Sequence, residues 1–246
     1  MSDTALVVMA RYPLPGTTKT RLARTLGDKE TRKLYQAFLI DLANHFASTD
    51  CDLYWAYTPA AIDYTAFIDT LVPHLAGASR SFPQQGTDFA ARLLHAFQWT
   101  RQQGYASTIL IGSDSPHVTR ELVSQAREAL QEANVVLGPA DDGGYYLIAM
   151  REPHDVFSDI PMSTSVVTAL TLARAKGLGL TTKLIEPLFD VDEYTDLLRL
   201  AELLRLNSAL APATAALIAS QRSLYDHDSI HACDPAARHP AALDLP

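Results

Sequence analysis

Two acidic side chains, Asp141 and Asp142, stand next to each other just before a Gly-Gly turn that joins two apolar segments. Adjacent carboxylates repel each other and favour neither a helix nor a strand, so a bound cation, a hydroxyl-rich ligand or a proton transfer explains them better. A solvated hairpin, in which Asp-Gly only supplies the geometry of the turn, is the alternative. The pair is therefore a candidate for chemistry at the end of a strand.

A basic loop, residues 13–21, follows the first apolar run and leads to an expected helix start. Its Lys19 and Arg21 could surround a diphosphate, Arg21 through forked hydrogen bonds and Lys19 as a point charge. The loop lacks the second glycine and the Gly-Lys-Ser/Thr end of a P-loop, which excludes a Walker-type ATPase. A charged, solvated loop is the alternative, but residues 1–33 carry a surplus of bases over acids: Arg11, Lys19, Arg21, Arg24, Lys29, Arg32 and Lys33 against Asp3, Asp28 and Glu30.

A further acid, Asp114, lies just past the apolar run 109–111. As a ligand of Mg²⁺ or Mn²⁺ it would need phosphate oxygens and at least one more carboxylate. Asp190 or Asp192 could supply that carboxylate, and the two point to the same side if their segment is extended. Helix capping is the alternative, by Asp114 together with Thr119, and by Asp192 for a helix that begins near residue 194.

The amide side chains of residues 84–88 form the last candidate group. Gln85 could read the edge of a nucleobase, and Gly86 would let the base lie near the backbone. An ordinary loop before a capped helix explains the segment nearly as well. The eight histidines are scattered without metal-ligand spacing, and no Gly-x-Ser-x-Gly elbow or Cys-His arrangement indicates a covalent hydrolase.

Alternating strands and helices must position these loops. Apolar runs predict strands, and residues spaced at the helical period predict helices between them. This order predicts an α/β fold, a three-layer α/β/α sandwich with a mostly parallel central sheet, whose ligands bind beyond the carboxyl ends of the strands. The strands are expected at 5–10, 51–57, 108–111, 134–138, 145–150 and 180–185, and the helices at 29–46, 87–102, 119–130, 163–175 and 194–206.

Composition limits the functional class. The chain has 246 residues, 48% of them hydrophobic, which is enough to bury a substantial core, and no run is long enough to span a membrane. The absence of a signal-peptide pattern predicts a cytoplasmic location. A net charge of -8 argues against binding of a nucleic-acid polymer, so a small phosphorylated ligand fits the basic N-terminal region better. Cys51 and Cys233 are far apart and indicate neither a disulfide framework nor a zinc site.

Five segments taken in order resemble one family. They are residues 15–22, 85–88, 111–116, 138–147 and 190–192, with sequences PGTTKTRL, QGTD, IGSDSP, GPADDGGYYL and DVD. This set is similar to the selenodomain-associated transferases, glycosyltransferase-like proteins of the GT-A nucleotide-diphospho-sugar transferase superfamily. The resemblance spans about residues 5–206. It implies a Rossmann-like GT-A fold over residues 1–211, a nucleotide-linked donor and a divalent cation, Mg²⁺ or Mn²⁺. Residues 212–246 are expected to form a short helix, to about residue 224, and a peripheral tail.

More distantly, the same loops resemble phospholactate guanylyltransferases and molybdopterin cofactor nucleotidyltransferases. This likeness implies nucleotide and metal contacts at matching positions: Gly16, Lys19 and Arg21 for phosphate, Gln85 and Gly86 for the base, Asp114 for metal, and Asp190 or Asp192 as the second metal ligand. The aromatic-small-Thr segment of those relatives appears here as Met162-Ser163-Thr164, so the aromatic side chain is absent.

Three functions remain open at this point. In the preferred one, an acceptor hydroxyl attacks the sugar of a nucleotide sugar, with Asp142, or less favourably Asp141, as general base and Tyr145 positioning a small acceptor. In the second, attack falls on the α-phosphorus of a nucleoside triphosphate and releases pyrophosphate. The third is a nucleotide-binding protein without turnover. Each is compatible with an oligomer.

Overall fold

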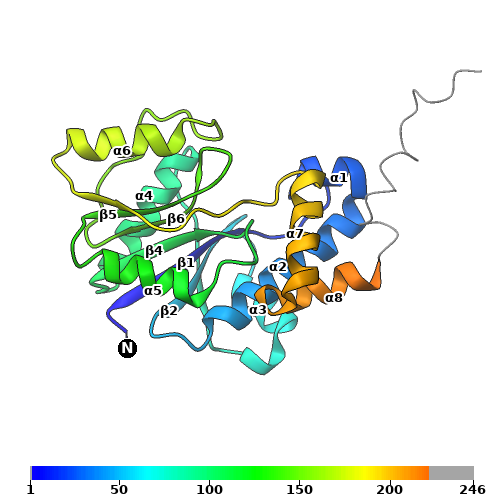
Figure 1. Cartoon of the computed structure of the whole chain (residues 1–246). Coiled ribbons are helices and arrows are strands. Elements are labelled where there is room, and N and C mark those ends of the chain that lie inside the picture. The colour runs from blue at the N-terminus through cyan, green and yellow to red at the C-terminus, as the bar shows by residue number, and fades with distance from the viewer. Residues whose placement is uncertain (1, 222–246) are drawn as a thin grey trace, which may run out of the picture.

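The computed structural model describes residues 2–221, which fold around a seven-stranded sheet of order β3-β2-β1-β4-β6-β5-β7 (Figure 1). β6 runs antiparallel to both of its neighbours, and every other pair of strands is parallel, so the predicted mostly parallel sheet is confirmed. The strands are β1 (Thr4–Arg11), β2 (Asp52–Thr58), β3 (Arg80–Pro83), β4 (Ser107–Gly112), β5 (Val135–Pro139), β6 (Tyr145–Met150) and β7 (Thr182–Leu184).

Helices cover both faces of the sheet, as the three-layer prediction requires (Figure 1). One buried cluster joins the sheet to α2, α3, α5 and α7, and a second joins it to α4 and α6. The α-helices are α1 (Thr20–Leu26), α2 (Asp28–Phe46), α3 (Tyr64–Leu71), α4 (Phe89–Gln102), α5 (Arg120–Ala129), α6 (Val167–Gly177), α7 (Tyr194–Leu206) and α8 (Pro212–Ser220), with short 3-10 turns at Pro73–Leu75 and Ser208–Leu210.

The central strand β1 explains why this chain builds two cores. Its residues 4–10 are all buried, and successive side chains point to opposite faces of the sheet. Leu6 and Val8 therefore pack in the cluster with α2, whereas Val7 and Met9 pack in the cluster with α4. A continuous apolar run is needed because both faces are covered.

Some elements differ from the predicted ones. The sequence pattern does not reveal β3 or α3, which are short. α6 begins at Val167 rather than at residue 163, because Ser163 adopts a left-handed conformation and the Ser165 backbone packs against Gly143 of the Gly-Gly turn. β7 has three residues rather than six, since it is an edge strand that pairs only with β5. Phe89, the first residue of α4, is a large apolar side chain that is 47% exposed.

α8 docks on α2 through a buried carboxylate. Asp41 accepts hydrogen bonds from the backbone N–H groups of Ala213 and Thr214, at 2.7 and 2.9 Å, and from the Thr214 hydroxyl at 2.6 Å. These bonds satisfy N–H groups in the first turn of α8, which have no partner inside the helix. The predicted boundary at residue 211 stays a prediction, and the predicted tail lies outside the described residues.

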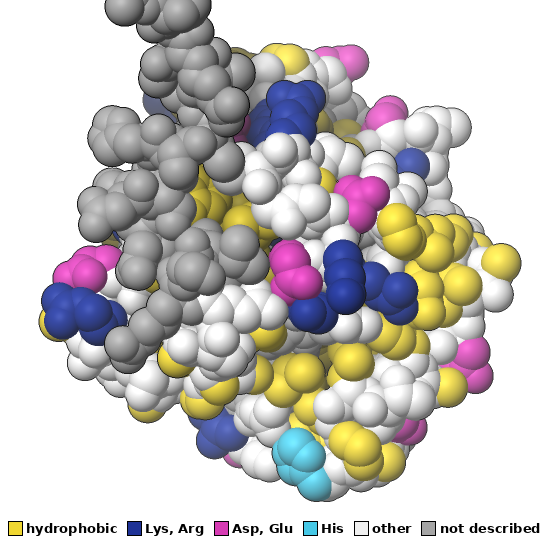
Figure 2. Space-filling view, turned by 90° about the vertical axis from the view of Figure 1, so that its right-hand side faces the viewer, with side chains coloured by type: hydrophobic (Ala, Val, Ile, Leu, Met, Phe, Trp, Pro, Cys, Tyr) yellow, Lys and Arg dark blue, Asp and Glu magenta, His cyan; other side chains and the backbone are white. Residues whose placement is uncertain are grey.

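The molecular surface mixes charges of both signs. On the face shown in Figure 2, Lys and Arg side chains lie beside Asp and Glu side chains rather than forming one broad basic surface. Several basic groups of residues 1–33 have acidic partners, for example Lys33 with Glu30 at 2.9 Å. Within residues 2–221, no helix has the length and apolar character that a membrane span requires.

Candidate functional site

A cavity of about 560 Å³ opens beyond the carboxyl ends of β1 and β4. Its walls come from segments far apart in the sequence, and they include seven of the predicted site residues: Lys19, Arg21, Asp114, Asp142, Tyr145, Asp190 and Asp192. The carboxyl ends of parallel strands meet at one edge of a sheet, which is why loops after different strands converge here.

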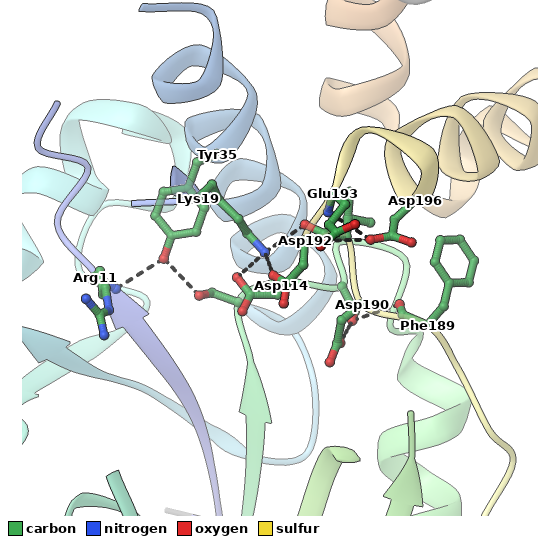
Figure 3. A network of polar contacts seen from close by, with 12 residues as sticks. Arg11, Lys19, Tyr35, Asp114, Phe189, Asp190, Asp192, Glu193 and Asp196 are labelled. Carbon is green, nitrogen blue, oxygen red and sulfur yellow. Dashed lines mark hydrogen bonds and ion pairs between the residues drawn. The ribbon is translucent and has the colours of Figure 1, made fainter. Parts of the chain in front are cut away.

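The Lys19 ammonium is the centre of the polar network at this cavity (Figure 3). Its Nζ lies 2.7 Å from Asp114 Oδ1 and 2.8 Å from Asp192 Oδ1, and it donates to the Val191 carbonyl oxygen at 2.8 Å. The Lys19 side chain is only 5% exposed. Burial alone would lower the pKa of Lys19, but the two carboxylates outweigh it and raise that pKa, so the lysine is a buried cation.

Backbone geometry places Lys19 and its partners. Lys19 is the residue before α1 and adopts the left-handed conformation, with φ 52° and ψ 46°. A residue with a Cβ seldom adopts this conformation, and the ion pairs of its side chain oppose the cost. The Val191 N–H donates to the Asp114 carbonyl oxygen at 3.0 Å, which ties the two acidic loops together.

The hydroxyl of Tyr35, a residue of α2, contacts two segments of the site. Its hydroxyl accepts a hydrogen bond from the Arg11 N–H at 3.1 Å and lies 2.8 Å from Ser113 Oγ, so it links the end of β1 to the loop that carries Asp114 (Figure 3). Burial, with the nearby Asp114 carboxylate, raises the pKa of Tyr35 to about 12. Tyr35 is thus a neutral hydrogen-bonding group at neutral pH.

Asp190 is the most buried acid of the site. Ser115 Oγ donates a short hydrogen bond to Asp190 Oδ1 and lies 3.1 Å from the Phe189 carbonyl oxygen. Burial, and then the charge of Asp114, raise the pKa of Asp190 to about 7. Carboxyl groups close together disfavour one another's ionisation. A cation placed among them would reverse this effect.

The alternative role of Asp192 as a helix cap is wrong. Glu193 is the residue before α7, and its side chain and that of Asp196 form a reciprocal capping box. Asp192 contributes only its backbone N–H, which donates to Asp196 Oδ2 at 3.1 Å. Its carboxylate therefore faces Lys19, and although burial would raise the pKa of Asp192, the attraction of Lys19 lowers it.

The two adjacent aspartates, Asp141 and Asp142, have different surroundings. Asp142 lines the cavity, and its Oδ1 accepts a hydrogen bond from the Gly144 N–H at 2.8 Å. Asp141 does not line the cavity and forms an ion pair with Arg199, from Oδ2 to Nη1, at 2.6 Å. The turn between them and β6 needs Gly143, because φ is +88° and an added Cβ would lie 2.0 Å from the Ser165 carbonyl oxygen.

Tyr145 lines the cavity, but its hydroxyl is buried next to the Thr171 side chain. Burial raises the pKa of this hydroxyl. The Thr171 side chain acts in the opposite direction, but burial has the larger effect, so Tyr145 is a neutral hydroxyl at neutral pH.

Gly16, Gln85 and Gly86 do not line the cavity. Gly86 serves packing, since its φ is +142° and an added Cβ would lie 2.8 Å from the backbone of α4. Gln84, one position earlier, lines the cavity instead, and its Nε2 donates to the carbonyl oxygens of Ala10 and Ala56 at 3.2 and 2.8 Å. The sequence reasoning gave no site role to three further lining residues, which are Arg11 at the end of β1 and Phe89 and Arg92 in the first turn of α4.

The residues around Lys19 Nζ are suited to a divalent cation. Two carboxylate oxygens and one carbonyl oxygen already surround a single positive charge at 2.7–2.8 Å, and Mg²⁺ and Mn²⁺ prefer this class of ligand. Within residues 2–221, no three His, Cys, Asp or Glu side chains are grouped as a ready-made metal site. Phosphate oxygens of a ligand would have to complete the coordination shell.

Comparisons with known proteins agree with this fold. The model of a family described as uncharacterized protein conserved in bacteria (DUF2064) matches residues 42–164. The structure of a presumed nucleotide-diphospho-sugar transferase from Desulfovibrio desulfuricans G20 is similar with a TM-score of 0.84 and 32% identity, covering 92% of this chain and 97% of that one. The phosphoenolpyruvate guanylyltransferase of Chloroflexus aggregans is 28% identical over 182 residues, 71% of this chain and 86% of that protein. A Leptospira borgpetersenii cytidylyltransferase shares the fold alone, with a TM-score of 0.54 and 10% identity over 92% of this chain and 98% of that one.

Proposed function

The chain belongs to the bacterial family DUF2064, and we propose that it is a transferase that uses a nucleotide-linked donor and a divalent cation. The observation that carries the proposal is the cluster of Lys19, Asp114 and Asp192 at the cavity wall. A site for phosphates alone gains nothing from several carboxylates, whereas a site for a cation-bound diphosphate needs both signs of charge. The selenodomain-associated resemblance is consistent with this class of activity.

The cation is part of the proposal because the oxygen donors fit it. Asp114 and Asp192 would hold it, and Asp190, which lines the same cavity, is the candidate for a further ligand. When bound, the ion would neutralise negative charge that grows on the diphosphate as the bond to it breaks. Side chains of the protein would bind the donor and accept the proton of the acceptor.

Basic side chains of the cavity bind and orient the donor. Arg21 lines the cavity and has only a loose contact with Glu193, 3.7 Å from Nη1 to Oε1, so its guanidinium is available to phosphate oxygens. Arg11 and Arg92 add two more guanidinium groups on the same cavity. A guanidinium matches phosphate with two parallel hydrogen bonds, which fixes the orientation of the donor as well as its charge.

Glycosyl transfer to a small hydroxyl acceptor is the better supported reaction. Asp142 lines the cavity, and only its Oδ1 is engaged, by Gly144, so Oδ2 can accept the proton of an attacking hydroxyl. Asp141 is the weaker candidate because Arg199 already holds it. Tyr145, which lines the cavity, would position the acceptor.

Nucleotidyl transfer is the second candidate, and the excess of guanidinium groups favours it. Arg11, Arg21 and Arg92 would suit the larger charge of a nucleoside triphosphate. The guanylyltransferase of Chloroflexus aggregans, a relative at 28% identity, is named for this reaction class. An acceptor that is already ionised would not need Asp142 as a base.

The released product separates these candidates. We would incubate the protein with Mn²⁺ or Mg²⁺, panels of nucleotide sugars and nucleoside triphosphates, and small hydroxyl or acidic acceptors. Free nucleoside diphosphate supports glycosyl transfer, and pyrophosphate supports nucleotidyl transfer. Binding of a nucleotide without any product, across all panels, would reject the enzymatic proposal and leave a nucleotide-binding protein.

A further inference from the structure

We propose that Lys19 and the divalent cation exchange at one position: the ammonium occupies the cation site until the metal binds, and Lys19 then moves to the phosphates of the donor. The inference rests on the proposed function, from which it takes the cation and the diphosphate. It assigns Lys19 two successive partners within one cycle of binding.

The first step of the argument is the number of hydrogen-bond donors. An ammonium has three N–H groups. In the structure all three have an acceptor, namely Asp114 Oδ1 at 2.7 Å, Asp192 Oδ1 at 2.8 Å and the Val191 carbonyl oxygen at 2.8 Å (Figure 3). No N–H remains for a phosphate oxygen. The predicted phosphate contact of Lys19 therefore requires the lysine to leave these acceptors.

The second step is electrostatic. A dication held by the Asp114 and Asp192 oxygens would lie against the ammonium. The Lys19 side chain is only 5% exposed, although each carboxylate is 44% exposed, so water and salt would screen the repulsion only in part. Before a nucleotide arrives, Asp114 and Asp192 would face a dication and an ammonium together with only two negative charges. This imbalance favours displacement of the ammonium when the cation binds.

The third step is that the displaced ammonium stays in the cavity. Thr17, Thr18 and Arg21 of the same loop line that cavity, so Lys19 can reach the place of the diphosphate by rotating its flexible four-carbon stem. Without a nucleotide, the released ammonium would lose its anionic partners. Metal and nucleotide should therefore bind cooperatively, each favouring the other through Lys19.

The test measures Mn²⁺ binding without nucleotide, by calorimetry and by the electron paramagnetic resonance signal of free Mn²⁺. Lys19→Met should bind Mn²⁺ at least about tenfold more tightly than the wild type, because the competing cation is gone. Lys29→Met is the matched control, since Lys29 is an exposed lysine outside the cavity, and it should bind like the wild type. Equal or weaker binding in Lys19→Met would overturn the exchange.

A second measurement uses the wild-type protein, in case the variant does not fold. Acetylation of lysines, mapped by mass spectrometry, should spare Lys19 without metal and label it when Mg²⁺ is added, while Lys29 is labelled in both states. Protection of Lys19 at saturating Mg²⁺ would overturn the exchange even if transfer is observed. Conversely, exchange without turnover on any nucleotide panel would reject the proposed function and leave the exchange standing.

Discussion

Replacing His117 with phenylalanine should remove a large part of the acid sensitivity of the folded state. His117 is 2% exposed, its ring lies 4.4 Å from that of Phe189 between centroids, and neither ring nitrogen has a hydrogen-bond partner among residues 2–221. Burial, and then the charge of Arg199, lower the pKa of His117 from 6.5 to about 4. The folded protein therefore holds this imidazole neutral at a pH where the unfolded chain protonates it.

The sign and size of the effect follow from this difference. Between the two pKa values the unfolded state binds more protons, so the free energy of unfolding falls as the pH falls. Each pKa unit corresponds to about 1.4 kcal/mol, so the full contribution is about 3 kcal/mol, of which about 2 kcal/mol is lost between about pH 7.5 and about pH 5. His117→Phe keeps the ring contact and has no group to protonate, so it should lack this loss.

Urea unfolding, followed by circular dichroism at both pH values, measures the difference directly. Val118→Ala is the control, because it removes buried methyl groups next to His117 but no titratable group. It should lower the free energy of unfolding by the same amount at both pH values. If His117→Phe loses as much stability as the wild type on acidification, the buried neutral imidazole is not the cause and the reasoning is refuted.

Four further changes test the site and its scaffold. Asp114→Ala should abolish Mn²⁺-dependent nucleotide binding with the fold intact, as checked by calorimetry and circular dichroism; an unchanged titration with Mn²⁺ would refute its role as ligand. Asp142→Asn should spare donor binding but slow transfer about 10²–10⁴-fold in a product-release assay, and full activity would remove it as the base. Asp41→Ala should lower the free energy of unfolding in urea by about 2–3 kcal/mol, because the first turn of α8 loses its acceptor, and an unaltered midpoint would contradict this docking. Gly143→Ala should cost about 2–4 kcal/mol in the same assay through its clash with residue 165, whereas Gly177→Ala, with nothing within 4 Å of an added Cβ, should cost nothing.

Much of the fold could be predicted from local patterns. The fully apolar β1 indicates a strand covered on both faces, and the spacing of buried residues in α2 indicates a helix with one buried side. The capping threonine before α5 is confirmed, with Leu122 N–H donating to Thr119 Oγ1. The sequence pattern does not predict β3 or α3, because segments of four and eight residues are too short to show a clear hydrophobic period.

The sequence predicted the position of some cavity residues correctly and of others only to within one residue. Lys19 and Asp114 lie at the cavity because the loops that carry them follow β1 and β4, two paired strands whose carboxyl ends share one edge of the sheet. Gln84 rather than Gln85 lines the cavity, because pairing of β3 with β2, Pro83 opposite Tyr57, fixes the position at which the chain leaves the sheet. A sequence pattern gives strand ends only to within a few residues.

The sequence by itself determined the three-layer fold and the loops that carry charge at the strand ends, because burial and periodicity are local properties of a chain. Only the tertiary structure decided which side chain of each neighbouring pair serves the site. Asp142 faces the cavity whereas Arg199 holds Asp141, and Lys19 pairs with Asp192 across 173 positions of sequence. Such partners are chosen by packing between distant segments, and short-range patterns contain no information about them.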